Sequence, residues 1–211
     1  MMYLGGLCVI TDRSSCRISY EEMVLRTLRA GAGWVQYRDK ISAKRTVYEE
    51  AVRLRNIARD FEAVFIVNDY PDIAHAADAD GVHLGQDDLP LREARKIVGR
   101  KKIVGISTHN LNEAIEAERN GADYIGVGPV FQTGTKDAGL PKGTALIREI
   151  KRQIHLPVVA IGGINLDNIM SVMQEKADAV AVASAILSGN IEDNTRKFLE
   201  MIKSFRIAHH S

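Results

Sequence analysis

The sequence predicts a single-domain α/β protein with a (β/α)8, or TIM-barrel, architecture. Three observations predict it: eight short apolar segments, an amphipathic helix-like stretch after each, and a repeat of roughly 20–30 residues that fills the 211-residue chain. Most of the apolar segments are uninterrupted, which is typical of parallel strands buried on both faces. The runner-up is an open doubly wound sheet, but the first strand lacks the GxGxxG turn of a dinucleotide fold.

The predicted strands are rich in β-branched residues. They are residues 7–11, 34–37, 64–67, 81–84, 103–106, 124–127, 158–161 and 179–183. Ser19 with Glu22 forms a capping box at one helix start, and Asn110 with Glu113 forms a related cap at another. Residues 30–33 and 120–123 place glycine where a helix ends in a left-handed residue before the next strand.

Bulk composition narrows the class of protein. Lys and Arg total 28 against 27 Asp and Glu, so a net charge of +1 favours neither nucleic acid nor a membrane surface. The two cysteines, without a basic leader or a long apolar segment, predict a soluble cytoplasmic protein. We expect a catalytic domain over residues 1–206 and a frayed tail over 207–211, and a homo-oligomer is compatible with the sequence.

Glycines and a serine after the last two strands predict a phosphate site. In this fold, phosphate often binds the loops after strands seven and eight. Gly162 and Gly163 end the seventh strand, and Ser184 ends the eighth. Glycine lets backbone N–H groups approach phosphate oxygens, although the pair is also compatible with a mere tight turn.

Two carboxylates end neighbouring strands. Asp69 closes the third strand and Asp88 follows the fourth, so they are close enough in a barrel to share a Mg²⁺ ion together with substrate phosphates. Three other interpretations stay open: Asp87 or Asp88 caps the next helix, Asp69 pairs with Arg38, or the two carboxylates act as an acid–base dyad.

Three cations accompany these carboxylates. Arg38 and Lys40 follow the second strand and lie on one side if extended geometry persists, and Lys136 ends the loop that begins at Thr133. A solvated surface is the usual place for a lone lysine. A cluster of three at the strand ends would instead hold a polyphosphate and stabilise it as a leaving group.

Taken together, these motifs resemble the thiamine phosphate synthase (thiamine-phosphate pyrophosphorylase) family. The resemblance covers residues 7–187 and is carried by an ordered set of motifs: QYRDK at 36–40, VND at 67–69, GVHLGQDD at 81–88, GISTH at 105–109, GVGPVF at 126–131, TGTK at 133–136 and IGGI at 161–164.

The resemblance implies an enzyme that joins a hydroxymethylpyrimidine diphosphate to a thiazole phosphate and releases pyrophosphate. It implies Mg²⁺ on Asp69 and Asp88, and pyrimidine recognition by Gln36. The implied diphosphate ligands are Arg38, Lys40, Asn68, Ser107 and Lys136, of which all but Asn68 are also expected to be catalytic. The implied thiazole phosphate ligands are Thr133, Thr135, Gly163, Ala183 and Ser184. The family's dissociative reaction needs a charge clamp rather than a nucleophile, and the chain carries no convincing Ser-His-Asp or Cys-His set.

Three rival functions remain. A thiazole tautomerase on the same scaffold would use His109 for proton transfer, whereas a structural histidine would only orient a loop. A non-catalytic phosphate-binding regulator would not need both metal ligands and a leaving-group clamp. A sugar-phosphate isomerase or aldolase is the third, but no lysine inside a strand suggests a Schiff base.

Overall fold

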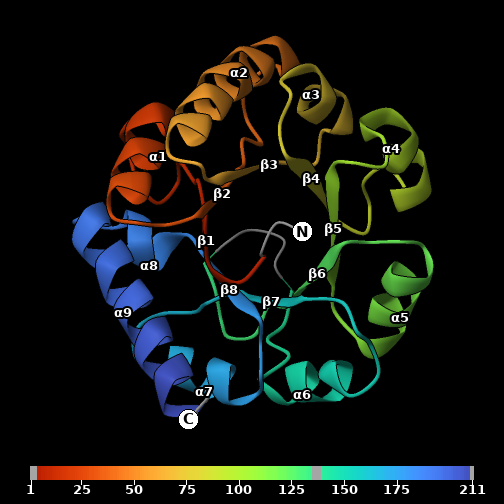
Figure 1. Ribbon diagram of the computed structural model, residues 1–211, viewed down its shortest axis with the longest axis vertical. Coiled ribbons are helices and arrows are strands. Elements are labelled where there is room, and N and C mark those ends of the chain that lie inside the picture. The colour runs from red at the N-terminus through yellow and green to blue at the C-terminus, as the bar shows by residue number, and fades with distance from the viewer. Residues whose placement is uncertain (1–3, 135–138, 210–211) are drawn as a thin grey trace.

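Eight apolar segments form the inner wall of the molecule. The computed structural model describes residues 4–134 and 139–209, in which the strands make one closed parallel barrel ringed by helices (Figure 1). The strands are β1 (Gly6–Ile10), β2 (Trp34–Tyr37), β3 (Val64–Asn68), β4 (Gly81–Leu84), β5 (Ile103–Thr108), β6 (Tyr124–Val127), β7 (Val158–Ile161) and β8 (Ala179–Val182). β1 pairs with both β2 and β8, which confirms the (β/α)8 prediction and excludes the open sheet.

The helices follow the strands in turn. They are α1 (Tyr20–Arg29), α2 (Lys44–Asp60), α3 (Pro71–Ala76), α4 (Leu91–Val98), α5 (Leu111–Arg119), α6 (Ala145–Lys151) and α7 (Ile169–Gln174), with α8 (Ser184–Leu187) and α9 (Ile191–His209) both after β8. α9 continues to His209 and so includes three of the five residues expected in the terminal tail. No helix in the described part of the chain has the length and apolarity needed to cross a membrane.

Both predicted helix starts have the predicted side-chain cap, but the return bond of the capping box at Ser19 is absent from the described residues, because the Glu22 carboxylate pairs with Arg26. The Ser19 hydroxyl accepts from the Glu22 N–H at 3.1 Å, and the Asn110 side chain accepts from the Glu113 N–H at 3.0 Å. Gly31 and Gly121 take positive φ after α1 and α5, as predicted. Three other helix ends use non-glycine residues in the same conformation, which the glycine pattern could not reveal: Glu62, Asp78 and Lys176.

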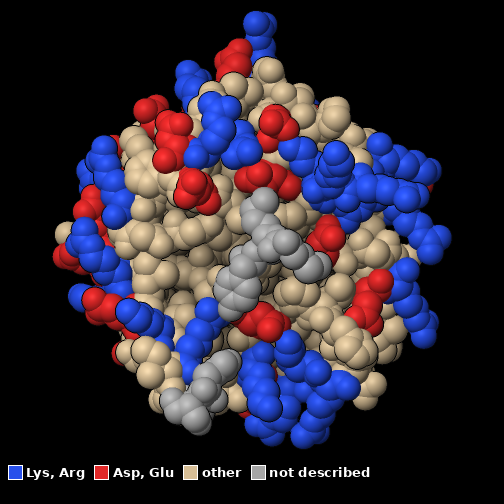
Figure 2. All heavy atoms as spheres, viewed as in Figure 1, with Lys and Arg blue, Asp and Glu red and all other residues tan. Residues whose placement is uncertain are grey.

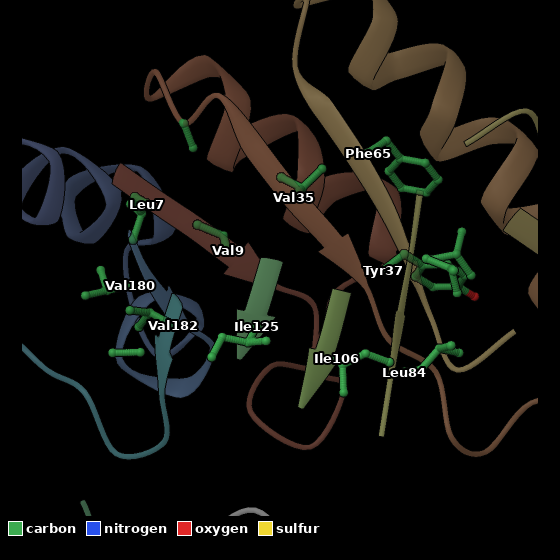
Figure 3. Packing of buried hydrophobic residues seen from close by; sticks show 14 of the residues in the cluster. Leu7, Val9, Val35, Tyr37, Phe65, Leu84, Ile106, Ile125, Val180 and Val182 are labelled. Carbon is green, nitrogen blue, oxygen red and sulfur yellow. The ribbon is translucent and has the colours of Figure 1, made fainter. Parts of the chain in front are cut away.

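Strand side chains alternate between two buried layers. The larger layer lies between the strands and the helices, and Figure 3 shows members of it such as Val35, Phe65 and Val182. Each such apolar side chain contributes about 1.5–3 kcal/mol when it is fully buried. The alternate positions fill the barrel interior, among them Trp34 and Tyr124, whose rings meet edge to face at 5.2 Å.

Aspartate side chains hold the amino ends of three strands, β3, β5 and β7. A residue just before β4, β6 and β8 accepts a backbone N–H from β3, β5 and β7 respectively, and also pairs with a basic residue of a helix. The carboxylates are Asp80, Asp123 and Asp178, and their basic partners are Arg55, Arg95 and Lys151. These contacts stabilise the amino-terminal face of the barrel and leave the opposite face for the functional site.

Charged side chains of both signs lie on the face of the molecule seen in Figure 2. Figure 2 shows basic and acidic side chains interspersed around the rim of the face in view, with neither sign covering it. This mixture of signs agrees with the net charge of +1.

Candidate active site

The loop after β2 is fixed by Asp39. Its Oδ1 atom accepts the N–H groups of Ile41 at 2.9 Å and Ser42 at 3.0 Å, and its other oxygen accepts from the Tyr37 hydroxyl at 3.5 Å. Burial favours the neutral acid, but the hydrogen bonds from Ser42 and Ile41 outweigh it and hold the pKa of Asp39 below its ordinary value. This turn ends the extended geometry of β2 at Tyr37. The alternation that would direct the Arg38 and Lys40 side chains to the same side of the strand therefore does not apply to them.

Lys40 and two carboxylates meet on one side of the site. Lys40 Nζ lies 2.6 Å from Asp69 Oδ2, so the partner of Asp69 is Lys40 and not Arg38. Burial raises the pKa of Asp69, and Asp88 raises it further through its charge and a side-chain hydrogen bond, while Lys40 opposes the rise. Asp88 Oδ2 also accepts the Gly85 N–H at 2.7 Å, which fixes the loop after β4. The two carboxylates of the predicted metal site are therefore adjacent.

The backbone of Asp69 is unusual. It is left-handed, with φ 68°, and among the described non-glycine residues it alone has positive φ at the carboxyl end of a strand. Its N–H donates to the His83 carbonyl at 2.8 Å, which ties the end of β3 to β4. Strained conformations held in place by such contacts cluster at functional sites.

The carboxylate pair fits a divalent cation. Two adjacent carboxylates, a nearly buried Asp69 and a half-buried Asp88, share one lysine and leave an uncompensated negative charge, and burial together with Asp88 raises the pKa of Asp69. Within the described residues, no group of three or more His, Cys, Asp or Glu side chains is arranged around one point. Mg²⁺ characteristically uses one or two carboxylates and completes its coordination with water and phosphate oxygens, so a pair is sufficient.

A pocket lies on the other side of the site, over the ends of β7 and β8. It brings together Arg38, Thr133, Gly163, Ala183 and Ser184. Asp12 also lines it, and its carboxylate is occupied by the Ser14 and Ser15 hydroxyls. The pocket thus combines one guanidinium with hydroxyls and backbone, which is a donor set for an anion.

The glycine pair has a structural task as well as a chemical one. A Cβ atom on Gly162 would lie 2.6 Å from Pro129, and one on Gly163 would lie 2.4 Å from the Gln132 carbonyl oxygen. The loop after β6 therefore packs against both glycines, and a side chain at either position would collide with its backbone or with Pro129. The Gly163 N–H has no acceptor within the described residues, so it remains a donor at the pocket.

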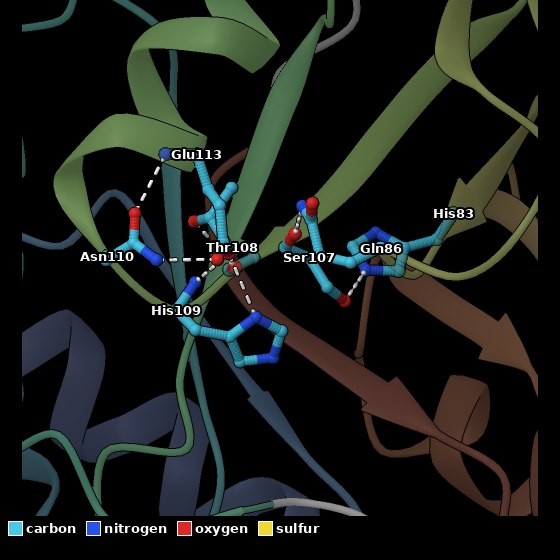
Figure 4. Close-up of polar contacts among 8 residues, drawn as sticks. His83, Gln86, Ser107, Thr108, His109, Asn110 and Glu113 are labelled. Atoms are coloured by element: carbon cyan, nitrogen blue, oxygen red, sulfur yellow. Dashed lines mark hydrogen bonds and ion pairs between the residues drawn. The ribbon is translucent and has the colours of Figure 1, made fainter.

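Three predicted ligands belong to the barrel interior. Gln36 on β2, Asn68 on β3 and Ser107 on β5 occupy inward-facing strand positions. Gln36 is buried at 5% exposure, and the Ser107 carbonyl accepts from the Gln86 side chain at 2.6 Å (Figure 4). Thr135 and Lys136 lie outside the described residues, and their places in the site stay predictions.

His83 and Tyr124 are polar residues that the sequence interpretation did not assign to the site. His83 Nε2 lies 2.9 Å from Ser107 Oγ, and His83 Nδ1 lies 2.8 Å from the Tyr124 hydroxyl. Burial lowers the pKa of His83 to about 4, against a small opposing effect of Asp88. The available signal was positional: both residues share the inward alternation of Gln36 and Ser107.

His109 turns toward its own helix. Its Nδ1 atom lies 3.0 Å from Glu113 Oε2, and its backbone N–H donates to the same oxygen at 2.7 Å, as Figure 4 shows. These contacts tie His109 to the first turn of α5. The histidine therefore has the environment of a residue that orients the loop after β5.

Comparisons with known proteins agree with this geometry. Residues 7–186 match the family model of thiamine monophosphate synthase. The thiamine-phosphate synthase of Shouchella clausii is 51% identical over 168 residues, covering 79% of this chain and 80% of the relative. That of Methanosarcina mazei is 42% identical over 200 residues, covering 94% and 83%.

A solved structure extends the similarity to three dimensions. Thiamine phosphate pyrophosphorylase from Pyrococcus furiosus superposes with a TM-score of 0.88 at 39% sequence identity, covering 95% of this chain and 96% of its own. The identity and coverage exceed what a shared barrel alone would give. The chain belongs to the thiamine monophosphate synthase family.

Proposed function

We propose that this enzyme couples 4-amino-2-methyl-5-hydroxymethylpyrimidine diphosphate with 4-methyl-5-hydroxyethylthiazole phosphate, giving thiamine phosphate and pyrophosphate. Family membership supports the coarser statement that the chain is a transferase that forms thiamine phosphate. The observation that carries the finer proposal is the pairing of two anion sites across one barrel mouth. Lys40 and the Asp69–Asp88 pair would form one when the pair holds Mg²⁺, and the pocket of Arg38, Gly163 and Ser184 would form the other.

The first site suits the diphosphate. Asp69 and Asp88 would hold Mg²⁺, which when bound supplies positive charge to the departing diphosphate oxygens. Lys40 lies against Asp69 and can donate to the same oxygens, and Asn68 and Ser107 add neutral donors from the adjacent strand ends. Arg38 and Lys136 complete the proposed clamp.

The second site suits a monoester phosphate. Thr133, Gly163 and Ser184 line this pocket, with Ala183 beside them, and we propose that they offer two hydroxyls and a backbone N–H to the phosphate. Arg38 lines this pocket as well, and we propose that its guanidinium contacts the thiazole phosphate in addition to the diphosphate. Thr135 is proposed to close the pocket from the loop after β6.

The proposed chemistry needs no general base. The methylene C–O bond breaks and its electron pair leaves with the diphosphate, while the electron-rich aminopyrimidine bears the cation. The lone pair of the thiazole nitrogen then forms the new C–N bond, and no proton has to be removed. The protein accordingly positions the two substrates and stabilises the leaving group, with Gln36 recognising the pyrimidine.

The rival functions lack a supporting observation. His109 is bound to Glu113, which disfavours its use as the proton-transfer group of a tautomerase. A regulator that only binds phosphate gives no reason for the adjacent carboxylates beside Lys40. We propose residues 1–206 as the catalytic domain and the cytoplasm as its location.

The proposal is tested by incubating the purified protein with both substrates and Mg²⁺. We expect thiamine phosphate and pyrophosphate to form in equal amounts. Neither product should form when the thiazole phosphate is omitted, and excess EDTA should prevent the formation of both. Isomerisation of the thiazole phosphate without pyrophosphate release would overturn the assignment in favour of a tautomerase. Binding of both substrates without turnover would favour a regulator.

A further inference from the structure

We propose that His83 and Tyr124 are positioning residues, which link Gln36 to Ser107 through the barrel interior and fix the hydrogen-bonding groups that these two residues present to the substrates. This inference rests on the proposed function, because it assigns Gln36 and Ser107 to the substrates. The hydrogen-bond chain of Gln36, Tyr124, His83 and Ser107 is called the relay below.

The relay is continuous across the barrel. Ser107 Oγ lies 2.9 Å from His83 Nε2, and His83 Nδ1 lies 2.8 Å from the Tyr124 hydroxyl. The Gln36 side chain interacts with the Tyr124 hydroxyl, and we propose that this interaction completes the relay. Four strands, β2, β6, β4 and β5, therefore contribute one residue each, and Figure 4 shows the His83–Ser107 end of the chain.

Space for the relay is built into neighbouring strands. A Cβ atom on Gly105 would lie 2.1 Å from the Tyr124 ring, and one on Gly126 would lie 3.1 Å from the His83 ring. Any larger residue at Gly105 would displace Tyr124. Both rings are nearly inaccessible to solvent, at 7% exposure for His83 and 1% for Tyr124, so their rotamers are fixed by packing.

The relay assigns one direction to each of its hydrogen bonds, and this assignment includes the tautomer of His83. In the relay as proposed, the Gln36 amide N–H donates to the phenolic oxygen of Tyr124. The phenolic proton is then free to donate to His83 Nδ1. A neutral imidazole with an accepting Nδ1 carries its proton on Nε2, and that proton is donated to Ser107 Oγ.

This direction determines what the two ends offer. Ser107 Oγ accepts from His83, so its own proton points away toward an acceptor, such as a diphosphate oxygen in the mouth of the barrel. Gln36 uses an N–H inward, so its carbonyl oxygen is directed to a donor, such as the exocyclic amino group of an aminopyrimidine. The Gln86 amide holds the Ser107 carbonyl at 2.6 Å and fixes the backbone beneath it.

Substitutions separate this relay from simple packing. Tyr124→Phe keeps the ring and removes the hydroxyl, and we expect kcat/KM for the pyrimidine diphosphate to fall roughly 10-fold to 100-fold, with KM for the thiazole phosphate unchanged. The matched control is Trp34→Phe, which alters the ring packed against Tyr124 but no hydrogen bond of the relay. It should lower the melting temperature and change kcat/KM by less than about twofold. Equal losses in both variants would overturn the proposal.

Two variants of His83 test its two nitrogens. Glutamine places an amide N–H near the position of Nε2 and should recover part of the activity, whereas asparagine reaches only toward Tyr124 and should not. The loss in His83→Asn should disappear in a Ser107→Ala background, since the effect passes through Ser107. Additive losses, or equal activity in the two His83 variants, would contradict the relay.

A spectroscopic measurement tests the relay without any turnover. Two-bond ¹⁵N–¹H correlations of labelled protein report the tautomer of each of the six histidines, and His83→Gln identifies the His83 signal. We expect His83 with its proton on Nε2, and a mixed population in Tyr124→Phe. An Nδ1-protonated His83 in the unmodified protein would overturn the relay even if thiamine phosphate forms. If no product forms but the Nε2 tautomer is present, the proposed function fails and the relay stands.

Discussion

Lys40 Nζ lies 2.6 Å from Asp69 Oδ2 and joins the loop after β2 to the end of β3. The contact places a cation beside one of two adjacent carboxylates, at the edge of the barrel where Mg²⁺ and a diphosphate are proposed to bind. The side chain of Asp69 is 10% exposed and that of Lys40 is 49% exposed, so the lysine can turn to a substrate while the carboxylate stays in place.

Asp69→Asn tests the charge at this contact. Burial raises the pKa of Asp69 above its ordinary value of 3.8. The ionised carboxylate therefore lowers the free energy of unfolding as pH rises from 3.8 through the raised pKa of the folded state. At neutral pH the metal-free variant should therefore be as stable as the parent or more so. The stabilisation of the parent by added Mg²⁺ should vanish, and turnover should fall at least about 100-fold. Thermal unfolding with and without Mg²⁺ measures both effects, and an unchanged response to Mg²⁺ would remove Asp69 from the metal site.

Asp88→Ala should abolish Mg²⁺-dependent turnover. The change removes a proposed metal ligand and the acceptor of the Gly85 N–H. Asp87→Ala is the matched control, because Asp87 is the exposed neighbour in the same loop. Mg²⁺ titrations of the rate should show saturation in the control only. Full activity in Asp88→Ala would exclude its proposed role.

Lys136→Ala tests the part of the clamp that comes from the loop after β6. The variant should slow diphosphate departure more than it weakens thiazole phosphate binding, because the positive charge of Lys136 is proposed to stabilise the departing diphosphate. Single-turnover rates and equilibrium binding separate the two quantities. Lys142→Ala, an exposed lysine further along the loop, should leave both unchanged. Equal effects on departure and binding would contradict the proposed role.

Asp39→Asn tests the turn that positions Arg38 and Lys40. Folding lowers the pKa of Asp39, so the ionised carboxylate stabilises the folded protein at pH values above its ordinary pKa of 3.8. This stabilisation is lost as pH falls through the lower pKa of the folded state. The variant should lose about 1–2 kcal/mol of unfolding free energy at neutral pH, since its hydrogen bonds lose their charge. Denaturant unfolding at several pH values should show the difference shrinking in acid. Asp60→Asn, exposed at the end of α2, is the control.

His109→Ala tests the structural interpretation of this residue. The side chain is 39% exposed and pairs with Glu113, so the cost should stay below about 1 kcal/mol, and coupling should remain within about twofold of the parent. Parallel assays of coupling and of thiazole isomerisation measure the outcome. If His109→Ala alone abolishes activity, a tautomerase-like role gains support.

The repeating fold was predictable because it rests on local patterns. Apolar runs, helix caps and glycine ends are each readable within a few residues, and all eight predicted strands form. The largest difference is in β5, which runs to Thr108 rather than 106. The glycine signal missed Glu62, Asp78 and Lys176, because tertiary contacts can hold an ordinary residue in the left-handed conformation.

The sequence by itself determined which residues end the strands, because a polar residue after an apolar run can be recognised from its neighbours in the chain. Closure of the barrel decided what those residues meet: Lys40 rather than Arg38 beside Asp69, and Arg38 in the pocket with Gly163 and Ser184. It also decided that His83 and Tyr124, polar residues in otherwise apolar strands, lie between Gln36 and Ser107. Such contacts join positions far apart in the chain, and only the register and curvature of the whole sheet specify them.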